Sequence, residues 1–107
     1  MTVNEAIEKL DAKSVCMCDG EKEIKSAYVG DFLSFAISKQ GENCIWFTVM
    51  NNVNVAGVAT LTDCSLIVLC DGILPDDNLF KKAIVQKINI CSVKTDVYET
   101  VVKYSQI

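Results

Sequence analysis

The 107 residues and 11.8 kDa of this chain suit one domain that buries an ordinary hydrophobic core. Half of the residues are hydrophobic and 22% are charged, a composition that predicts a folded globular protein. Ten lysines oppose fourteen acidic residues, with no arginine and no histidine. This excludes bidentate arginine contacts to phosphate and all histidine chemistry, and without clustered cations we expect no nucleic-acid partner.

Membrane attachment is not expected either. The most apolar run, residues 64–70, is bounded by Asp63 and Asp71 and falls far short of the roughly 18 residues of a membrane span. Residues 1–13 lack the basic region and apolar core of a signal peptide. We therefore predict a cytoplasmic location.

The N-terminal part of the sequence begins with a helical pattern and continues with two extended segments. Thr2 and Glu5 have the spacing of a capping box, which predicts the start of a first helix. The runs at 14–18 and 24–29 are typical of strands, and the charged segment 19–23 between them predicts a turn. The expected apolar face of the helix comprises Val3, Ile7 and Leu10.

A second helix is predicted to open at Gly30-Asp31, to run through Lys39 and to end at Gly41. Its apolar surface is unusually broad, comprising Phe32, Leu33, Phe35, Ala36 and Ile37. Asp31 admits two interpretations: the cap of this helix, which the pattern favours, or the carboxylate of a site.

The middle of the chain has the pattern of a strand, a helix and a second strand. Residues 44–49 and 65–70 are nearly continuous apolar runs, typical of strands that are covered on both faces. A helix is expected over about 54–62. We expect the two strands to be parallel neighbours or near neighbours, because a helical crossover returns the chain to the same end of the sheet.

The C-terminal part adds a helix, a strand over 88–93 and a final helix. Pro75 suits the first turn of the former helix, and Asp76-Asp77 favour its N-terminus through the helix dipole. Thr95 is the predicted cap of the final helix. The expected inward-facing residues of the two helices are Leu79, Phe80, Ala83, Ile84, Val97, Tyr98, Val101 and Val102.

Strands that alternate with short helices predict right-handed crossovers and a mainly parallel sheet with helices on both faces. The predicted fold class is therefore α/β, a three-layer α/β/α arrangement, with residues 1–107 as a single domain. Sites in such folds lie beyond the carboxyl ends of the strands, where helix N-termini present free N–H groups. Four joins qualify: 29–31, 50–54, 71–75 and 93–96.

The six cysteines predict buried reduced thiols, not a metal site or a disulfide framework. The one close pair, Cys16 and Cys18, is C-x-C instead of the C-x₂-C of metal knuckles, and alternation places both on the same face of a strand. The other four lie singly within or beside apolar runs: Cys44, Cys64, Cys70 and Cys91. We expect no metal and no other cofactor.

Three segments resemble the DRTGG domain, and the resemblance covers roughly residues 1–105. They are AYVGDFLS (27–34), the amide-bearing stretch with its exit loop (46–77), and INICSVKTDVYETVVK (88–103). That family occurs alone, in the regulatory region of CBS-type pyrophosphatases and in some phosphotransacetylases, and is related to the N-terminal domain of HPr kinase. The resemblance implies an HPr-kinase N-terminal-domain-like fold and a regulatory role. None of its motifs is catalytic.

The sequence departs from the family's pattern at two turns. Lys25-Ser26-Ala27 stands where the family usually has a Thr-Gly-Gly run, so a close backbone approach through those glycines is in doubt. The family's Gln-Thr-His-x-Asn turn here has Met50, Asn51 and Asn52 in its first three positions, while Asn54 matches. A role that depends on the histidine is excluded.

Three asparagines at one join raise the question of a site. Asn52 or Asn54 could cap the following helix, with the others tolerating left-handed turn geometry. Alternatively, the amides could contact a small polar ligand or a second subunit. The candidate ligand-binding or interface residues are Tyr28, Gly30, Asp31, Asn51, Asn52, Asn54, Asp71, Gly72 and Thr95.

The predicted function is a non-catalytic regulatory or small-ligand-sensing module, homodimeric and with a nucleotide-like ligand. The dimer is expected because a mean hydropathy of +0.28 leaves apolar surface for a partner. The alternative is a scaffold that docks on a larger metabolic enzyme. A third hypothesis, a small enzyme that uses Asp31 and Lys25, lacks other catalytic residues.

Overall fold

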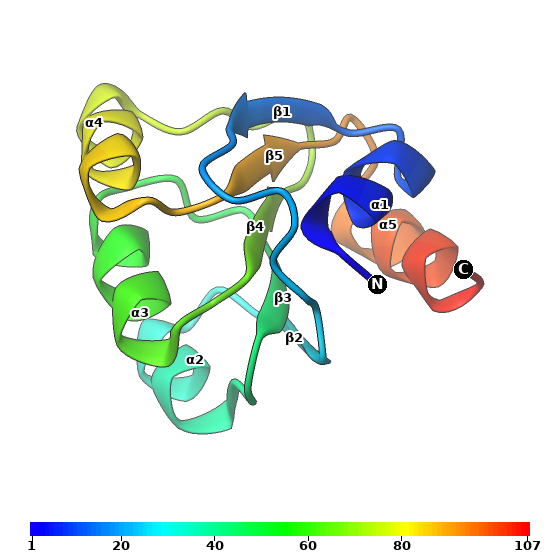
Figure 1. Ribbon diagram of the computed structural model, residues 1–107, viewed down its shortest axis with the longest axis horizontal. Coiled ribbons are helices and arrows are strands. Elements are labelled where there is room, and N and C mark those ends of the chain that lie inside the picture. The colour runs from blue at the N-terminus through cyan, green and yellow to red at the C-terminus, as the bar shows by residue number, and fades with distance from the viewer.

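Five strands form one sheet in the computed structural model, which describes all of residues 1–107 (Figure 1). The sheet order is β1-β5-β4-β3-β2. The strands are β1 (Lys13–Cys16), β2 (Ser26–Val29), β3 (Cys44–Thr48), β4 (Leu66–Leu69) and β5 (Ile90–Ser92). Strands β2 to β5 are parallel, and β1 alone is antiparallel to its neighbour β5. The predicted mainly parallel sheet, with β3 and β4 as parallel neighbours, is confirmed.

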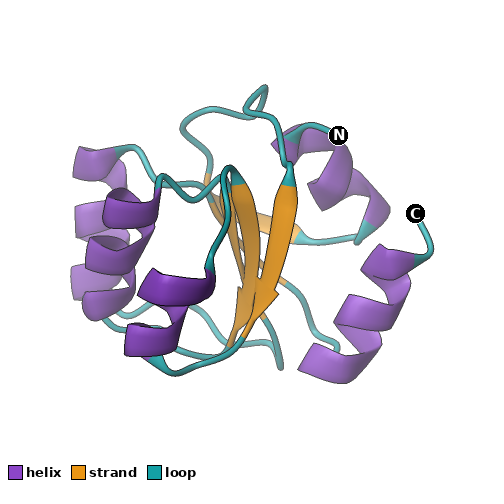
Figure 2. Cartoon of the chain, turned by 90° about the horizontal axis from the view of Figure 1, so that it is seen from below, coloured by secondary structure: helices purple, strands orange, loops and turns teal.

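Five helices cover the two faces of this sheet and make three layers (Figure 2). They are α1 (Val3–Lys9), α2 (Leu33–Lys39), α3 (Asn54–Thr62), α4 (Asp77–Gln86) and α5 (Val97–Ser105). Helices α2, α3 and α4 lie on one face and α1 and α5 on the other (Figure 1). Three successive right-handed crossovers, each moving one strand further in the same direction, place α2, α3 and α4 on one face.

The core has two halves, separated by the sheet. Alternate residues of β3 point to opposite faces, so Trp46 packs under α2 to α4 whereas Ile45 and Phe47 pack under α1 and α5. All five residues of β3 and all four of β4 are buried, as their continuous apolar runs predict. Phe47 also meets the ring of Tyr104 from α5, with centroids 5.4 Å apart.

Several local predictions are confirmed. The capping box at the start of α1 is complete: Glu5 N–H donates to Thr2 Oγ1 at 3.2 Å, and Thr2 N–H donates to Glu5 Oε1 at 3.0 Å. Helix α3 begins and ends at the expected residues. Strand β1 is shorter than predicted, because its register shifts between Ser14 and Cys16 and pairing ends there.

Three predicted helix starts are wrong. Helix α2 begins after Phe32, which has no side-chain cap, and Asp31 bonds elsewhere. Pro75 precedes α4 instead of occupying its first turn, because Asp76 is the cap and accepts from Leu79 N–H at 2.8 Å. Asp96, not Thr95, caps α5 and accepts from Glu99 N–H at 2.8 Å.

Several apolar residues that were expected to face inward are exposed. Only Ala36 of α2 is fully buried, and Phe32 and Phe35 are 64% and 53% exposed. In α4, Leu79 and Ala83 are buried while Phe80 and Ile84 lie on the surface, and in α5 Tyr98 is exposed. These helices pack through stripes narrower than their apolar composition suggests, because each contacts the sheet on one side only.

The cysteines follow the burial prediction with one exception. All six are free thiols; five are buried, and Cys18 is exposed because β1 ends before it. The sulfur atoms of Cys16 and Cys18 are 3.6 Å apart. Burial raises the pKa of the Cys16 and Cys44 thiols to about 11 and that of Cys91 to about 12. Such thiols stay protonated and unreactive at neutral pH.

Candidate functional site at the carboxyl edge of the sheet

The chain changes from one face of the sheet to the other after β5. The loop after β4 leads to α4 on one face, whereas the loop after β5 leads to α5 on the opposite face (Figure 1). In open parallel sheets, ligands bind beyond the carboxyl ends of the strands at such a switch point. The edge formed by the loops after β2, β3, β4 and β5 is therefore the place to look for a site.

The Asp31 carboxylate joins the loop after β2 to the end of β3. Its Oδ1 accepts from Thr48 Oγ1 at 2.6 Å and from Val49 N–H at 2.9 Å. Beside it, Gly30 C=O accepts from Trp46 Nε1 at 2.8 Å. A β-carbon added at Gly30 would lie 2.7 Å from the Tyr28 hydroxyl, so the glycine leaves room for that ring. Asp31 therefore connects the loop after β2 to the end of β3 through hydrogen bonds.

The asparagine turn joins the loop after β3 to the loop after β4. Asn51 Nδ2 donates to Leu74 C=O at 2.9 Å, and Asn51 C=O accepts from Asp76 N–H at 3.0 Å. Asn52 Oδ1 accepts from Asn54 N–H at 3.0 Å, at the first residue of α3. The expected left-handed geometry is wrong, because none of the three asparagines has a positive φ. The Asn54 side chain is exposed and makes no hydrogen bond.

Asp71 and Gly72 form a tight turn that meets the loop after β5. Both residues have left-handed backbones, with φ of 60° and 69°, which glycine adopts freely and aspartate tolerates. Asp71 N–H donates to Thr95 C=O and Gly72 N–H to Val93 C=O, each at 2.8 Å. These contacts close the crevice between the ends of β4 and β5, so the backbone donors of the turn are already satisfied.

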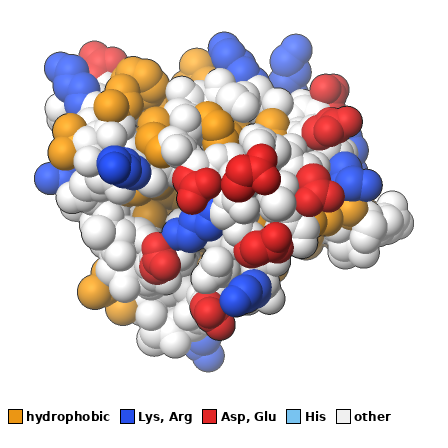
Figure 3. Space-filling view, viewed as in Figure 1, with side chains coloured by type: hydrophobic (Ala, Val, Ile, Leu, Met, Phe, Trp, Pro, Cys, Tyr) orange, Lys and Arg blue, Asp and Glu red, His pale blue; other side chains and the backbone are white.

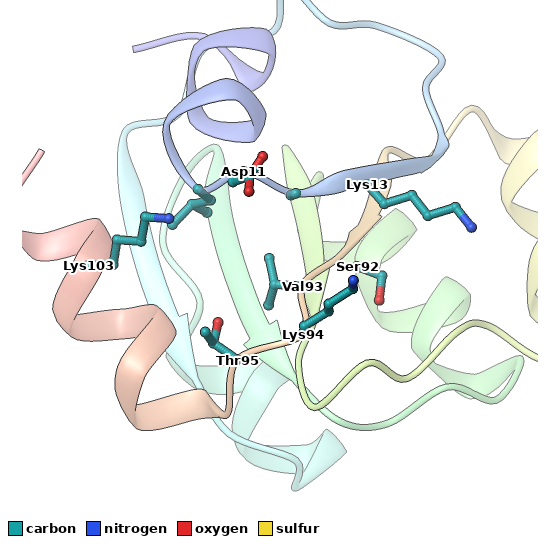
Figure 4. Close-up of a pocket in the computed structure, with 9 residues that line it drawn as sticks. Asp11, Lys13, Ser92, Val93, Lys94, Thr95 and Lys103 are labelled. Atoms are coloured by element: carbon teal, nitrogen blue, oxygen red, sulfur yellow. The ribbon is translucent and has the colours of Figure 1, made fainter.

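The structure has one surface pocket, of about 420 Å³, on the α5 side of this switch point (Figure 4). Its floor is apolar and its rim is charged. The lining residues are Leu10, Asp11, Ala12, Lys13, Ser92, Val93, Lys94, Thr95 and Lys103. They come from the turn between α1 and β1, from the end of β5 and from α5. The volume falls within the range of about 300–1,000 Å³ typical of small-molecule sites.

The rim of this pocket concentrates positive charge in a chain whose net charge is −4. Lys13, Lys94 and Lys103 line it together with one carboxylate, Asp11. None of these four side chains takes part in any of the three ion pairs of the structure. Lys103 extends from α5 toward the α1–β1 turn (Figure 4). The Lys13 side chain extends away from the pocket, so the ammonium groups of Lys94 and Lys103 are the ones that can attract an anion with an apolar part (Figure 4).

The sequence predicted a site at the carboxyl edge of the sheet but did not predict the lysine-lined pocket. Of the nine candidate residues, only Thr95 lines the pocket, and its hydroxyl lies 2.7 Å from that of Thr100. The other eight lie in or next to the loops that follow β2, β3 and β4. The pocket lysines were missed because they are separated by 81 and 9 residues and form no motif; the one available signal was Lys94, within the join 93–96.

Two other arrangements bear on chemistry. Lys25 precedes β2 and Asp31 follows it, so about 20 Å of extended chain separates them and they cannot act on one substrate. Lys25 instead contacts Glu42 at 3.4 Å. The structure contains no group of three or more cysteine, aspartate or glutamate side chains that could hold a metal ion. None of its helices has the length and apolar character that crossing a membrane requires.

Comparison with known proteins gives a match in structure only. No family model and no curated protein matches the sequence. The chain is similar to the crystal structure of the CBS and DRTGG domains of the regulatory region of Clostridium perfringens pyrophosphatase, complexed with the activator diadenosine tetraphosphate. The TM-score is 0.71 at 12% sequence identity, over 98% of this chain and 46% of the other, so this chain spans about half the length of its neighbour. The likeness supports a DRTGG-like fold.

Proposed function

We propose that this chain is a DRTGG-family, non-catalytic regulatory module that senses a small anionic, nucleotide-like ligand, and that it acts as a homodimer. The observation that carries the ligand part is the pocket beside Thr95, with its apolar floor and the unpaired Lys94 and Lys103. A nucleotide combines an apolar ring with charged phosphates, which is the chemistry that such a lining accommodates. The structural neighbour was solved with diadenosine tetraphosphate, which supports the same ligand class.

The residues of the site support a role in binding rather than in catalysis. No carboxylate pair, activated nucleophile or metal cluster lies around the pocket. The lysines can neutralise and orient an anion, while Leu10 and Val93 offer apolar contact. Because the turn between α1 and β1, the end of β5 and α5 all contribute to the lining, a bound ligand would link the N-terminal and C-terminal elements and stabilise their packing.

Isothermal calorimetry with AMP, ATP and diadenosine tetraphosphate tests the proposal. We expect binding to at least one of them, with affinity that falls as the salt concentration rises, because the ammonium groups are exposed. Replacing Lys94 or Lys103 by glutamate should weaken binding about tenfold or more, since each change reverses one charge at the rim.

Lys39 provides the matched control. It is exposed, belongs to no ion pair and lies on α2, outside the pocket. The Lys39→Glu variant carries the same change in net charge as Lys94→Glu and should bind as the unmodified protein does. If both variants weakened binding equally, the effect would come from the overall charge and not from the pocket. If none of the three nucleotides bound, the proposed ligand class would be wrong.

A scaffold that docks on a larger metabolic enzyme is the second candidate, and one surface favours it. Hydrophobic side chains gather over α4 in the space-filling view, where Phe80, Ile84 and Val85 are 38%, 53% and 75% exposed (Figure 3). Contiguous apolar surface of this kind is typical of protein contacts. Absence of nucleotide binding, together with co-purification of a partner that Val85→Asp releases, would support the scaffold over the sensor.

A further inference from the structure

The two edges of the sheet differ in how they are protected. At β1 a register shift between Ser14 and Cys16 and the charge of Lys13 disrupt further pairing. At the other edge, β2 is regular over its four residues and carries no charge, proline or bulge. Its outward N–H and C=O groups can therefore accept another strand. In a parallel pair, alternate residues of β2 turn their N–H and C=O groups away from β3 and toward the open edge.

An aromatic pair lies on the helix beside this edge. The rings of Phe32 and Phe35 pack edge to face, with centroids 4.9 Å apart and planes at 84°, yet both are more than half exposed. At 100° per residue they occupy the flank of α2 opposite to Ile37. In a right-handed crossover this flank turns away from α3 and toward the open edge of β2. Val29, at the end of β2, is 47% exposed.

From these features we infer that the β2 edge is a homodimer interface, in which β2 pairs antiparallel with β2 of a second copy and the two α2 helices pack across the two-fold axis. This inference rests on the homodimeric state proposed above and specifies its surface. A strand that pairs antiparallel with its own copy is self-complementary, as a two-fold axis requires. The sheet would continue through both copies with ten strands, twice the five of one chain.

Sheet geometry brings the two aromatic pairs together. Helix α2 covers β2 and β3, so two strand spacings of about 4.8 Å separate it from its copy across the new pair of strands. The resulting distance of about 10 Å is that of directly packed helices. Phe32 and Phe35 together expose about 230 Å² at roughly 200 Å² per ring, a substantial part of the ~800 Å² that each partner of a specific interface buries.

The inference also places the asparagine turn. Phe32 follows β2 at the carboxyl edge of the sheet, one strand away from Asn51 and Asn52. The exposed Asn54 amide and the adjoining Val53, 39% exposed, lie on this same side of the molecule, in the loop that begins α3. In the antiparallel dimer the carboxyl edges of the two copies point in opposite directions, so one asparagine turn would lie at each end of the interface, one strand away from it.

Light scattering at micromolar concentration, with amide hydrogen exchange, tests the interface. We expect the unmodified protein to be a dimer in which the outward-facing amides of β2 exchange slowly. The double variant Phe32→Asp/Phe35→Asp should raise the dissociation constant about tenfold or more and make those amides exchange quickly. The matched control is Ile84→Asp/Val85→Asp on α4, where the exposed apolar residues are also replaced by acids. It should remain dimeric.

Three results would overturn the inference: a monomeric unmodified protein, a Phe32→Asp/Phe35→Asp variant that is still a dimer, or dissociation by the α4 control alone. Circular dichroism confirms that each variant is folded, as exposed positions permit. Nucleotide titration of the monomeric variant separates the two proposals. Binding that persists with the interface disproved leaves the sensor intact, whereas a dimer without binding leaves the interface intact.

Discussion

Replacing Asp31 by alanine separates a structural role of this carboxylate from a role in ligand binding. The side chain accepts two hydrogen bonds, from Thr48 Oγ1 and Val49 N–H, at 2.6 and 2.9 Å. Bonds to a charged group contribute about 1.5–3 kcal/mol each, and the lower end applies because Asp31 is exposed. Thr48 is fully buried but keeps a contact with Met50 N–H. We therefore expect a loss of about 2–3 kcal/mol.

Urea unfolding followed by Trp46 fluorescence measures this loss. With a slope of about 1–3 kcal/mol/M, the midpoint should fall by about 0.7–3 M. Asp31→Asn keeps an acceptor oxygen without the charge and should lose about 1 kcal/mol. Nucleotide binding at the lysine pocket should be unaffected in folded variants. If Asp31→Ala kept its stability but lost ligand binding, the structural role of Asp31 would be refuted and the residue would belong to the binding site.

Three further predictions follow from buried groups. Asn89→Ala should destabilise the protein by about 3 kcal/mol in urea unfolding, because Asn89 is buried and makes four hydrogen bonds, with the N–H groups of Cys18 and Asp19 and the C=O groups of Asp19 and Ser65; a loss below about 1 kcal/mol would contradict this. Thiol titration at neutral pH should find one fast-reacting cysteine, which Cys18→Ser abolishes, because the other five are buried; several fast thiols would show that the core opens readily. Stability should fall above about pH 9, since the unfolded chain releases thiol protons there while burial holds the pKa of Cys91 at about 12; a Cys91→Val variant that unfolds with the same steepness between pH 9 and 11 would show that this thiol does not contribute.

The sequence predicted the strands and helices better than the roles of single side chains. Alternating apolar periods located the parallel strands and crossover helices, because burial of β3 and β4 on both faces demands continuous apolar runs. The capping box at Thr2 and Glu5 could also be predicted from the sequence, since both partners lie within one helical turn. Local patterns of this kind depend on residues that are close in sequence.

Contacts between distant residues decided the rest. Asp31 is a poor candidate for any cap once Thr48 and Val49, seventeen and eighteen residues away, are folded beside it. Asn51 likewise bonds to Leu74 in another loop. These choices depend on which loops the sheet order makes adjacent, and no local spacing encodes that order.

The sequence by itself determined the fold class, the absence of arginine and histidine chemistry, and the edge of the sheet at which polar residues gather. Only the tertiary structure decided which lysines line the pocket. Lys13 lies at the edge of the pocket because β1 pairs antiparallel with β5, which sets it opposite Ser92, and Lys103 lines the pocket because α5 packs on the other face of the sheet. The apolar excess was visible in the composition, but its place on the free flank of α2 depended on β2 being an edge strand. Strand order is set by long-range packing, and so it fixes both sites.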